Sequence, residues 1–250
     1  MRAFFVVSKY NEARYAAEDS ISNLKHALSI VEDIEIEDSI IEYRRFLARV
    51  IKEYGRIFMK LCDYEMAMKY VGEAEKLLNS ILDKYPNNIP ALNCMGWTLL
   101  IKGITYTREG RYKKAEETFI IAINNFFMNI LKLTNMQHTI AGAHCILAYK
   151  LLADVQILRG KLSDALNTLI DGNKLADKIY KKAPMSLFVI RNRALLVEST
   201  SKYMRISRVL DESRRLLEET IRQLEKILEY YNDDIFTMEV LVGFISKKRS

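Results

Sequence analysis

The residue types that most often catalyse reactions or bind metals are few in this chain and poorly placed to act together. The histidines are His26, His138 and His144. His138 and His144 are six residues apart, which is about 600° of helical rotation, so they point to different sides of a helix. The acidic run at residues 32–38 lacks the glycine and the ligand order of a calcium loop. The sequence also lacks a phosphate-binding loop, a dinucleotide fingerprint and a nucleophile elbow. We therefore expect no enzyme, no metal site and no cofactor.

The three cysteines, Cys62, Cys94 and Cys145, are spaced by 32 and 51 residues, which fits neither a metal site nor a disulfide framework. Each lies in an apolar stretch, where a free cysteine behaves as a small buried hydrophobe. Unpaired cysteines are typical of a reducing compartment. No uncharged apolar run approaches the ~20 residues of a membrane span. We therefore expect a cytoplasmic protein that does not bind membranes.

The clearest constellation is a row of five cations at spacings of 4, 3, 4 and 4 residues. This spacing places side chains along one side of a helix. The apolar residues of the same segment fall on a different side. Such a row could bind an acidic partner, or it could be an ordinary solvated face paired with Glu42 and Glu53. The row consists of Arg45, Arg49, Lys52, Arg56 and Lys60.

The elements that must position these residues are helices. The chain has only 9 glycines and 3 prolines in 250 residues, whereas a sheet-rich fold needs many Gly- and Pro-containing turns. Apolar residues recur at steps of 3, 4 and 7, which is typical of amphipathic helices. We predict an all-α fold with helices at about 8–32, 38–61, 64–84, 90–108, 111–131, 135–158, 161–181, 185–206, 208–231 and 235–246.

A repeated pattern runs through these helices. Its central copy has small, aromatic and turn residues at regular spacing: Gly103, Tyr106, Gly110, Tyr112, Ala115, Phe119 and Ala122. The other copies place Cys62, Gly160 and Arg208 at the turn and Ala67, Ala165 and Ser213 at the small position. The pattern resembles the tetratricopeptide repeat (TPR), in which small residues let two antiparallel helices approach closely. The resemblance implies a right-handed TPR-like α-solenoid of antiparallel helix pairs.

The period departs from that family. Ala67 and Ala115 are 48 residues apart, and Ala115 and Ala165 are 50 apart, whereas TPRs repeat every 34 residues. The excess is about two helical turns per helix. Gly96 and Gly103 extend the small-residue contact by one step of seven. We therefore expect unusually long helices in each pair.

The repeats suggest one domain over 1–250 without an internal linker. A solenoid needs caps over its exposed apolar ends. We favour a capping role over a dimer contact for the last helix, which is followed by a basic tail. The expected parts are an N-terminal cap and acidic loop at 1–37, helix pairs at 38–84, 85–131, 132–182 and 183–232, and a C-terminal cap at 233–250.

The resemblance also implies a binding surface, because the first helix of each TPR pair lines the concave groove. Its groove-facing positions fall on four cations of the row, namely Arg49, Lys52, Arg56 and Lys60. They also fall on Trp97, Arg108 and Lys150. Trp97, the only tryptophan, could equally be a core residue. The partner-binding residues that we predict are Arg45, Arg49, Lys52, Arg56, Lys60, Trp97, Arg108 and Lys150.

Charge leaves a second function open. Residues 101–200 carry 15 basic and 8 acidic residues, a net charge of +7. Our first hypothesis is a non-enzymatic adaptor that binds a protein or peptide, acidic or carboxylate-ended, in its groove. The alternatives are a factor that associates with RNA or the ribosome through this surplus, and the sensor module of a regulatory system. Salt dependence separates the first two, because phosphate contacts weaken steeply with salt.

Overall fold

The computed structural model describes residues 2–34, 37–231 and 234–248, and this part of the chain is helical throughout, with short turns and no strand. The prediction of an all-α fold is therefore confirmed. The chain forms two compact units, residues 1–130 and 131–250. Their boundary falls between the second and third expected helix pairs.

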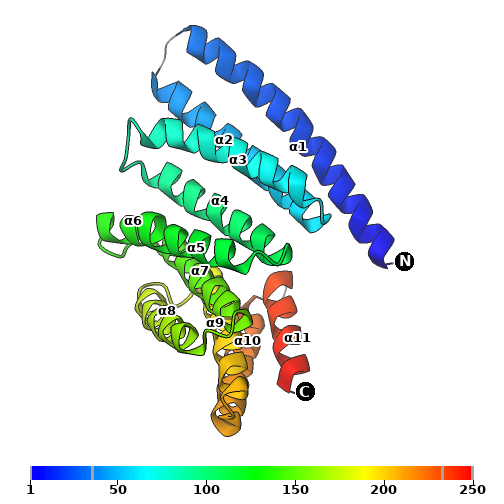
Figure 1. Ribbon diagram of the computed structural model, residues 1–250, viewed down its shortest axis with the longest axis vertical. Helices are drawn as coiled ribbons and strands as arrows, with labels where there is room; N and C mark the ends of the chain where they lie inside the picture. Colours follow the sequence, from blue (N-terminus) through cyan, green and yellow to red (C-terminus); the bar gives the residue numbers. More distant parts are fainter. Residues whose placement is uncertain (1, 35–36, 232–233, 249–250) are drawn as a thin grey trace. The chain divides into compact units, whose positions relative to one another are not determined.

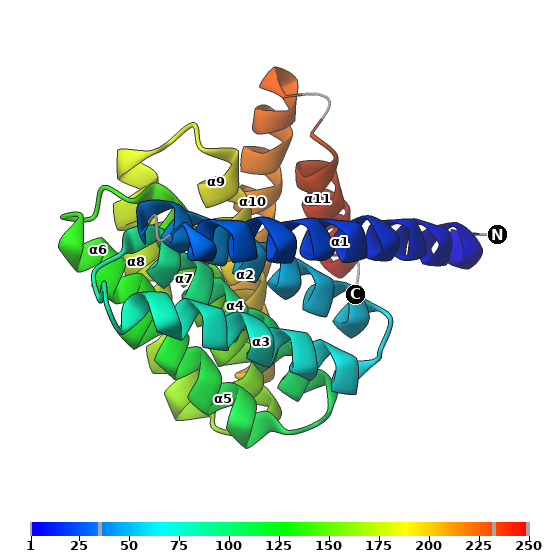
Figure 2. The same cartoon turned by 90° about the horizontal axis from the view of Figure 1, so that it is seen from above.

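The first unit is built around two helix pairs. α1 runs alongside α2 and contacts it (Figure 1). Figure 2 shows the same neighbours from above. α2 pairs with α3, and α4 pairs with α5 and the π-helical segment η1. The elements are α1 (Arg2–Asp33), α2 (Glu37–Lys60), α3 (Tyr64–Leu82), α4 (Ile89–Arg108), α5 (Tyr112–Ile121) and η1 (Ala122–Phe127), and α6 (Met128–Leu133) crosses the boundary.

The second unit continues the same alternation. α7 packs against α8 and α9, and α9 also contacts α8, α10 and α11. α10 packs against α11, which is the last helix (Figure 1). The elements are α7 (Thr139–Leu158), α8 (Leu162–Lys182), α9 (Leu187–Ile206), α10 (Leu210–Tyr230) and α11 (Ile235–Lys248).

Each helix pair is closed by the same turn, at residues 61–63, 109–111, 159–161 and 207–209. The middle residue of each turn has a positive φ: 63° at Cys62, 74° at Gly110, 72° at Gly160 and 61° at Arg208. This left-handed conformation ends a helix and lets the chain reverse. The residue after it donates a backbone hydrogen bond to the carbonyl five positions earlier, as in Arg111 N to Tyr106 O at 2.8 Å. The turn positions expected from the repeat pattern are confirmed.

Side chains that accept the first free N–H groups mark where helices begin. Asp63 accepts from Met66 N at 3.1 Å, and Asn88 accepts from Ala91 N at 2.9 Å. His138 Nδ1 accepts from Ala141 N at 3.0 Å and so starts α7. Such capping contributes about 0.5–2 kcal/mol per helix. His138 therefore has a structural role, and α7 begins at Thr139, later than the expected 135.

The small positions of the repeat are fully buried. Ala67, Ala115 and Ala165 have no exposed surface, and Ser213 is also buried. The backbone of α4 also approaches a neighbouring side chain closely at Gly96 and Gly103. A Cβ at Gly103 would lie 2.4 Å from Phe119 Cε1, and one at Gly96 would lie 2.6 Å from Phe127 Cε1. The extension of the small-residue contact by seven residues is confirmed for these two glycines.

The π-helical segment explains how this contact stays in register. Gly96 and Gly103 are seven residues apart, but their partners Phe119 and Phe127 are eight apart. A π-turn absorbs one additional residue because its hydrogen bonds span five residues. Met128 N accordingly donates to Ile123 O. The expected helix at 111–131 is therefore interrupted at 122–127.

Equivalent contacts recur in the two units. In the first unit, Lys102 Nζ of α4 binds Glu75 Oε2 of α3 at 2.8 Å. In the second, Asn173 Nδ2 of α8 donates to Thr200 Oγ1 of α9 at 3.2 Å. Both pairs are 27 residues apart in sequence. In both units, the second helix of one pair therefore contacts the first helix of the next pair at an equivalent position, as in a helical repeat.

Candidate functional site

The cation row lies on α2 beside α4, and the two helices contact each other directly. Two contacts fix their alignment. Lys52 Nζ lies 5.7 Å from the centre of the Trp97 ring, and Arg108 Nη1 donates to Met59 O at 3.1 Å. The residues in these contacts are 45 and 49 positions apart, close to the repeat period. α2 and α4 therefore run in the same direction, each at the corresponding place in its pair.

Three cations of the row form ion pairs with glutamates of the same helix, and one of the three is also buried. Arg45 Nη2 binds Glu42 Oε2 at 2.5 Å, and Arg56 Nε binds Glu53 Oε2 at 2.5 Å. Lys52 is only 6% exposed, and its Nζ binds Glu53 Oε1 at 3.0 Å. We expected the row to face solvent, and for Lys52 this expectation is wrong. α4 covers the side of α2 from which Lys52 projects.

The exposed members of the row are Arg49, Arg56 and Lys60. Arg49 forms no ion pair with any residue in the described part of the chain. Burial raises the pKa of Glu53, but Lys52 and Arg56 outweigh burial and hold this pKa below its ordinary value. Glu53 therefore stays ionised and neutralises part of the row. What remains is a short basic strip that can attract an anionic group.

The sequence left open whether Trp97 is a groove residue or a core residue, and its environment has features of both. Its side chain is half-buried and packs against the core cluster of the first unit, which includes Ile51, Met59 and Met95. One side of the indole faces the Lys52 ammonium, within the ~6 Å reach of a cation–π contact. Trp97 therefore belongs to the α2–α4 seam and is only partly open to a ligand.

The second unit has a corresponding seam between α7 and α9. Lys150 Nζ binds Asp154 Oδ2 at 2.8 Å within α7. Asp154 Oδ1 accepts from Ser199 Oγ of α9 at 2.9 Å and lies 4.0 Å from Lys202 Nζ. Lys150 thus takes part in a polar network that joins two helices. The predicted site residues are divided between the two units, with Lys150 alone in the second.

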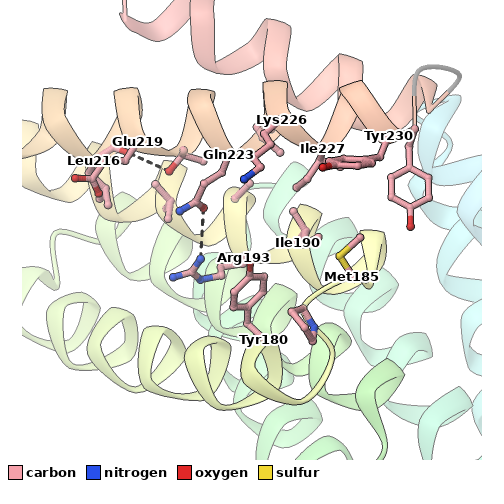
Figure 3. Close-up of a pocket in the computed structure, with 16 residues that line it drawn as sticks. Tyr180, Met185, Ile190, Arg193, Leu216, Glu219, Gln223, Lys226, Ile227 and Tyr230 are labelled. Carbon is pink, nitrogen blue, oxygen red and sulfur yellow. Dashed lines mark hydrogen bonds between the residues drawn. The ribbon is translucent and has the colours of Figure 1, made fainter.

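A pocket that sequence reasoning missed lies in the second unit, where α9 forms the floor and α10 and the end of α8 form the walls (Figure 3). Its volume is about 290 Å³. We call it the α10 groove. It is lined by Tyr180, Pro184, Met185, Ile190, Arg193, Ala194, Val197, Leu216, Glu219, Thr220, Gln223, Leu224, Lys226, Ile227, Tyr230 and Tyr231.

The polar side chains of the α10 groove are two cations, Arg193 and Lys226, one carboxylate, Glu219, and the side chains of Thr220, Gln223 and three tyrosines. Arg193 Nη2 binds Asp177 Oδ1 at 3.0 Å, and its Nη1 lies 3.5 Å from Gln223 Oε1 (Figure 3). The Arg193 guanidinium also lies 4.9 Å from the centre of the Tyr180 ring. Lys226 forms no ion pair with a described residue. An apolar groove with an unpaired cation can accept an apolar face that carries one carboxylate.

The remaining reactive residues do not gather. Among the described residues, no group of three or more His, Cys, Asp or Glu side chains is placed to hold a metal ion. Cys145 is buried and Cys94 half-buried, and burial raises the pKa of both thiols. Cys62 is exposed, contrary to our expectation of a buried cysteine, because it occupies the turn that ends α2.

One described helix, α7 at Thr139–Leu158, is long and apolar enough to cross a membrane by length and composition. It also packs against α8 and α9 of the second unit, and 56% of its most apolar window is buried. Its Ala141, Ala143, Ile146 and Ala148 have no exposed surface. This burial gives its apolar composition a structural cause.

These features define the class as an all-α helical-repeat protein. No family model matches the chain, and no curated protein matches it. Among solved structures, it is similar to BtubC (BKLC) from P. vanneervenii, with 14% identity, a TM-score of 0.47 and coverage of 94% of this chain and 91% of that chain. A similarity this low carries no inference about function.

Proposed function

We propose that this protein is a non-enzymatic, cytoplasmic adaptor built as one right-handed TPR-like α-solenoid. It binds a segment of another protein on the face formed by the first helices of its pairs. The observation that carries the proposal is the α2–α4 seam, where first helices from successive pairs contact each other in the same direction. A second seam of this kind, between α7 and α9, supports a repeated binding face.

The partner segment is acidic or carboxylate-ended. Arg49, Arg56 and Lys60 are exposed along α2, and Arg49 has no ion pair among the described residues. Arg56 already forms an ion pair with Glu53, so an incoming carboxylate competes with the Glu53 carboxylate for the Arg56 guanidinium. Charged rim contacts of this kind steer association and contribute modestly to affinity. The half-buried indole of Trp97 offers apolar surface beside them.

The experiment compares two double variants with the same change in charge. Arg49→Glu with Arg56→Glu reverses the exposed strip, whereas Lys76→Glu with Lys113→Glu reverses exposed cations on the second helices α3 and α5. Proteins captured by each variant from native lysate are compared with those captured by the wild type. Loss of the same partners in the α2 variant only supports the proposal. Equal capture by both variants contradicts it.

Salt and nuclease distinguish the RNA-associated alternative. A nucleic acid held by several phosphate contacts dissociates steeply as salt rises, with a slope that reflects the number of contacts. A protein segment anchored by apolar surface does not. If capture is abolished by nuclease and lost at moderate salt, the RNA-associated alternative is supported, with the basic residues of 101–200 as the contact surface.

A further inference from the structure

α11 presents an apolar face that nothing in the described part of the second unit covers. Ile235 and Val242 are each 66% exposed, and Met238 is 39% exposed. These residues stand at positions i, i+3 and i+7 and so lie on one side of the helix. The opposite side is used for packing, since Phe244 is 1% exposed and belongs to the cluster formed with α9 and α10.

Glu239 lies within this exposed face, at position i+4 from Ile235. It is the only acidic residue of α11. It forms no ion pair with a described residue. The outer side of α11 is therefore an apolar stripe with one unpaired carboxylate at its centre.

The α10 groove has the complementary chemistry. Its lining follows α10 from Leu216 to Tyr230. The 14 steps from Leu216 to Tyr230 rise about 21 Å, and the 14-residue helix α11 has nearly the same length. Most of the lining side chains are aliphatic or aromatic. Glu219 lies two helical turns before Lys226 on α10, and Lys226 points from α10 toward α9 without an ion pair (Figure 3). The groove volume of about 290 Å³ lies at the lower edge of the ~300–1,000 Å³ range of small-molecule pockets.

We propose that the α10 groove of one copy of this protein binds the exposed face of α11 from a second copy, with Glu239 paired to Lys226. This is the helix-in-groove mode of recognition, in which anchors at i, i+3 and i+7 enter an apolar groove. Both surfaces belong to residues 131–250, so every copy carries one groove and one donor helix. The proposal uses no residue of the α2–α4 seam and stands apart from the proposed adaptor function.

The occupant follows from length and charge together. A foreign amphipathic helix would also fit the groove, but the chain itself supplies a helix of the required length with a single carboxylate among its apolar anchors. Covering both surfaces in one contact also removes exposed apolar side chains from two places. A second copy therefore accounts for two otherwise uncovered features with one interaction.

The test is a charge exchange in the full chain. The weight-average mass is measured by sedimentation equilibrium over a wide range of concentrations. The wild type should self-associate, and Lys226→Glu or Glu239→Lys should each raise the dissociation constant at least about tenfold, as close interfacial charge pairs do. Combining the two substitutions should restore association to within a few-fold of the wild type. Val242→Asp should prevent association through the apolar stripe itself.

Matched controls are Arg222→Glu and Glu229→Lys. Both are exposed residues of α10 outside the groove lining, and they carry the same changes in charge. They should leave the dissociation constant unchanged, and circular dichroism should show every variant folded. A wild type that stays monomeric at all concentrations overturns the proposal. Self-association that is indifferent to the charge exchange overturns it as well, and so does a monomer whose groove binds a different amphipathic helix.

Discussion

The ammonium of Lys52 lies 5.7 Å from the centre of the Trp97 ring, so that the middle of the cation row meets the only tryptophan across the α2–α4 seam. Lys52 is buried and Trp97 is half-buried. The fluorescence of Trp97 therefore reports on the contact between Lys52 of α2 and Trp97 of α4.

Lys52→Met should change the emission spectrum of Trp97, because methionine keeps an apolar side chain but removes the nearby cation. Acrylamide should quench Trp97 less than free tryptophan and more than a fully buried indole. Lys76→Met, at an exposed position of α3, is the matched control and should leave the emission unchanged. Identical spectra for wild type and Lys52→Met would contradict the cation–π contact.

Glycine-to-alanine substitutions should have opposite effects at different places in the fold. Alanine favours a helix by about 0.8–1.0 kcal/mol over glycine. Gly72→Ala on α3 should therefore stabilise the protein, because no atom lies within 4 Å of the added Cβ. Gly103→Ala should destabilise it, since overpacking against Phe119 costs about 1–3 kcal/mol.

Urea unfolding measures both changes. Phe119→Leu combined with Gly103→Ala should cost less than the sum of the single substitutions, because the smaller side chain relieves the crowding. A Gly103→Ala variant as stable as Gly72→Ala would show that α4 and α5 do not approach each other closely at Gly103.

The turns should respond to substitution according to their backbone. Gly110 has a φ of 74°, and no atom lies within 4 Å of a Cβ added there, so Gly110→Ala should lower the free energy of unfolding by about 1 kcal/mol through backbone strain alone. Arg208 has a φ of 61°, and Arg208→Gly should raise stability by up to about 1 kcal/mol. Thermal melting of both variants checks the sign, and equal shifts in one direction would contradict the account.

The attachment of α11 should weaken in acid. Asp234 accepts from Thr237 N at 3.0 Å and binds Arg191 of α9. Burial acts to raise the pKa of Asp234, but the hydrogen bonds from Thr237 and the charge of Arg191 outweigh it and hold this pKa below its ordinary value. The ionised form is thus favoured by folding. Its contribution is complete above about pH 4 and is lost as the pH falls through the lowered folded pKa.

Asp234→Asn should remove this part of the pH dependence, and Asp234→Ala should cost about 0.5–2 kcal/mol at neutral pH through loss of the helix cap. Urea unfolding at neutral and acidic pH measures both effects. Asp211→Asn, on the exposed first turn of α10, is the control and should retain the wild-type pH dependence. A wild-type profile in Asp234→Asn would exclude this carboxylate as the acid-sensitive group.

The helices could be predicted closely because local rules govern them. The turn positions Cys62, Gly110, Gly160 and Arg208 follow from the repeat pattern even where two of them are not glycine. The surplus residue between Phe119 and Phe127 could not be predicted, since one residue does not disturb the apolar periodicity enough to reveal a π-turn. It becomes evident only when the register of α4 against its partner helix is known.

The candidate site was harder to predict because its surroundings come from other helices. Spacing along α2 places Lys52 and Arg56 near one side, but only the position of α4 determines that Lys52 is buried and Arg56 exposed. The α10 groove draws Tyr180, Arg193 and Lys226 from three segments without a local motif. Binding surfaces shared among helices have no signature in any one of them.

Because of the π-helical segment, two contact positions seven residues apart on α4 pack against two positions eight residues apart on its partner helix. Deleting one residue between Phe119 and Phe127, such as exposed Asn124, would leave an ordinary α-helix whose two rings still meet Gly103 and Gly96. The same deletion in α8 would rotate every following side chain by about 100° away from its neighbours. The fold therefore tolerates a change in length at one place on its second helices, and insertions or deletions among related chains should gather there.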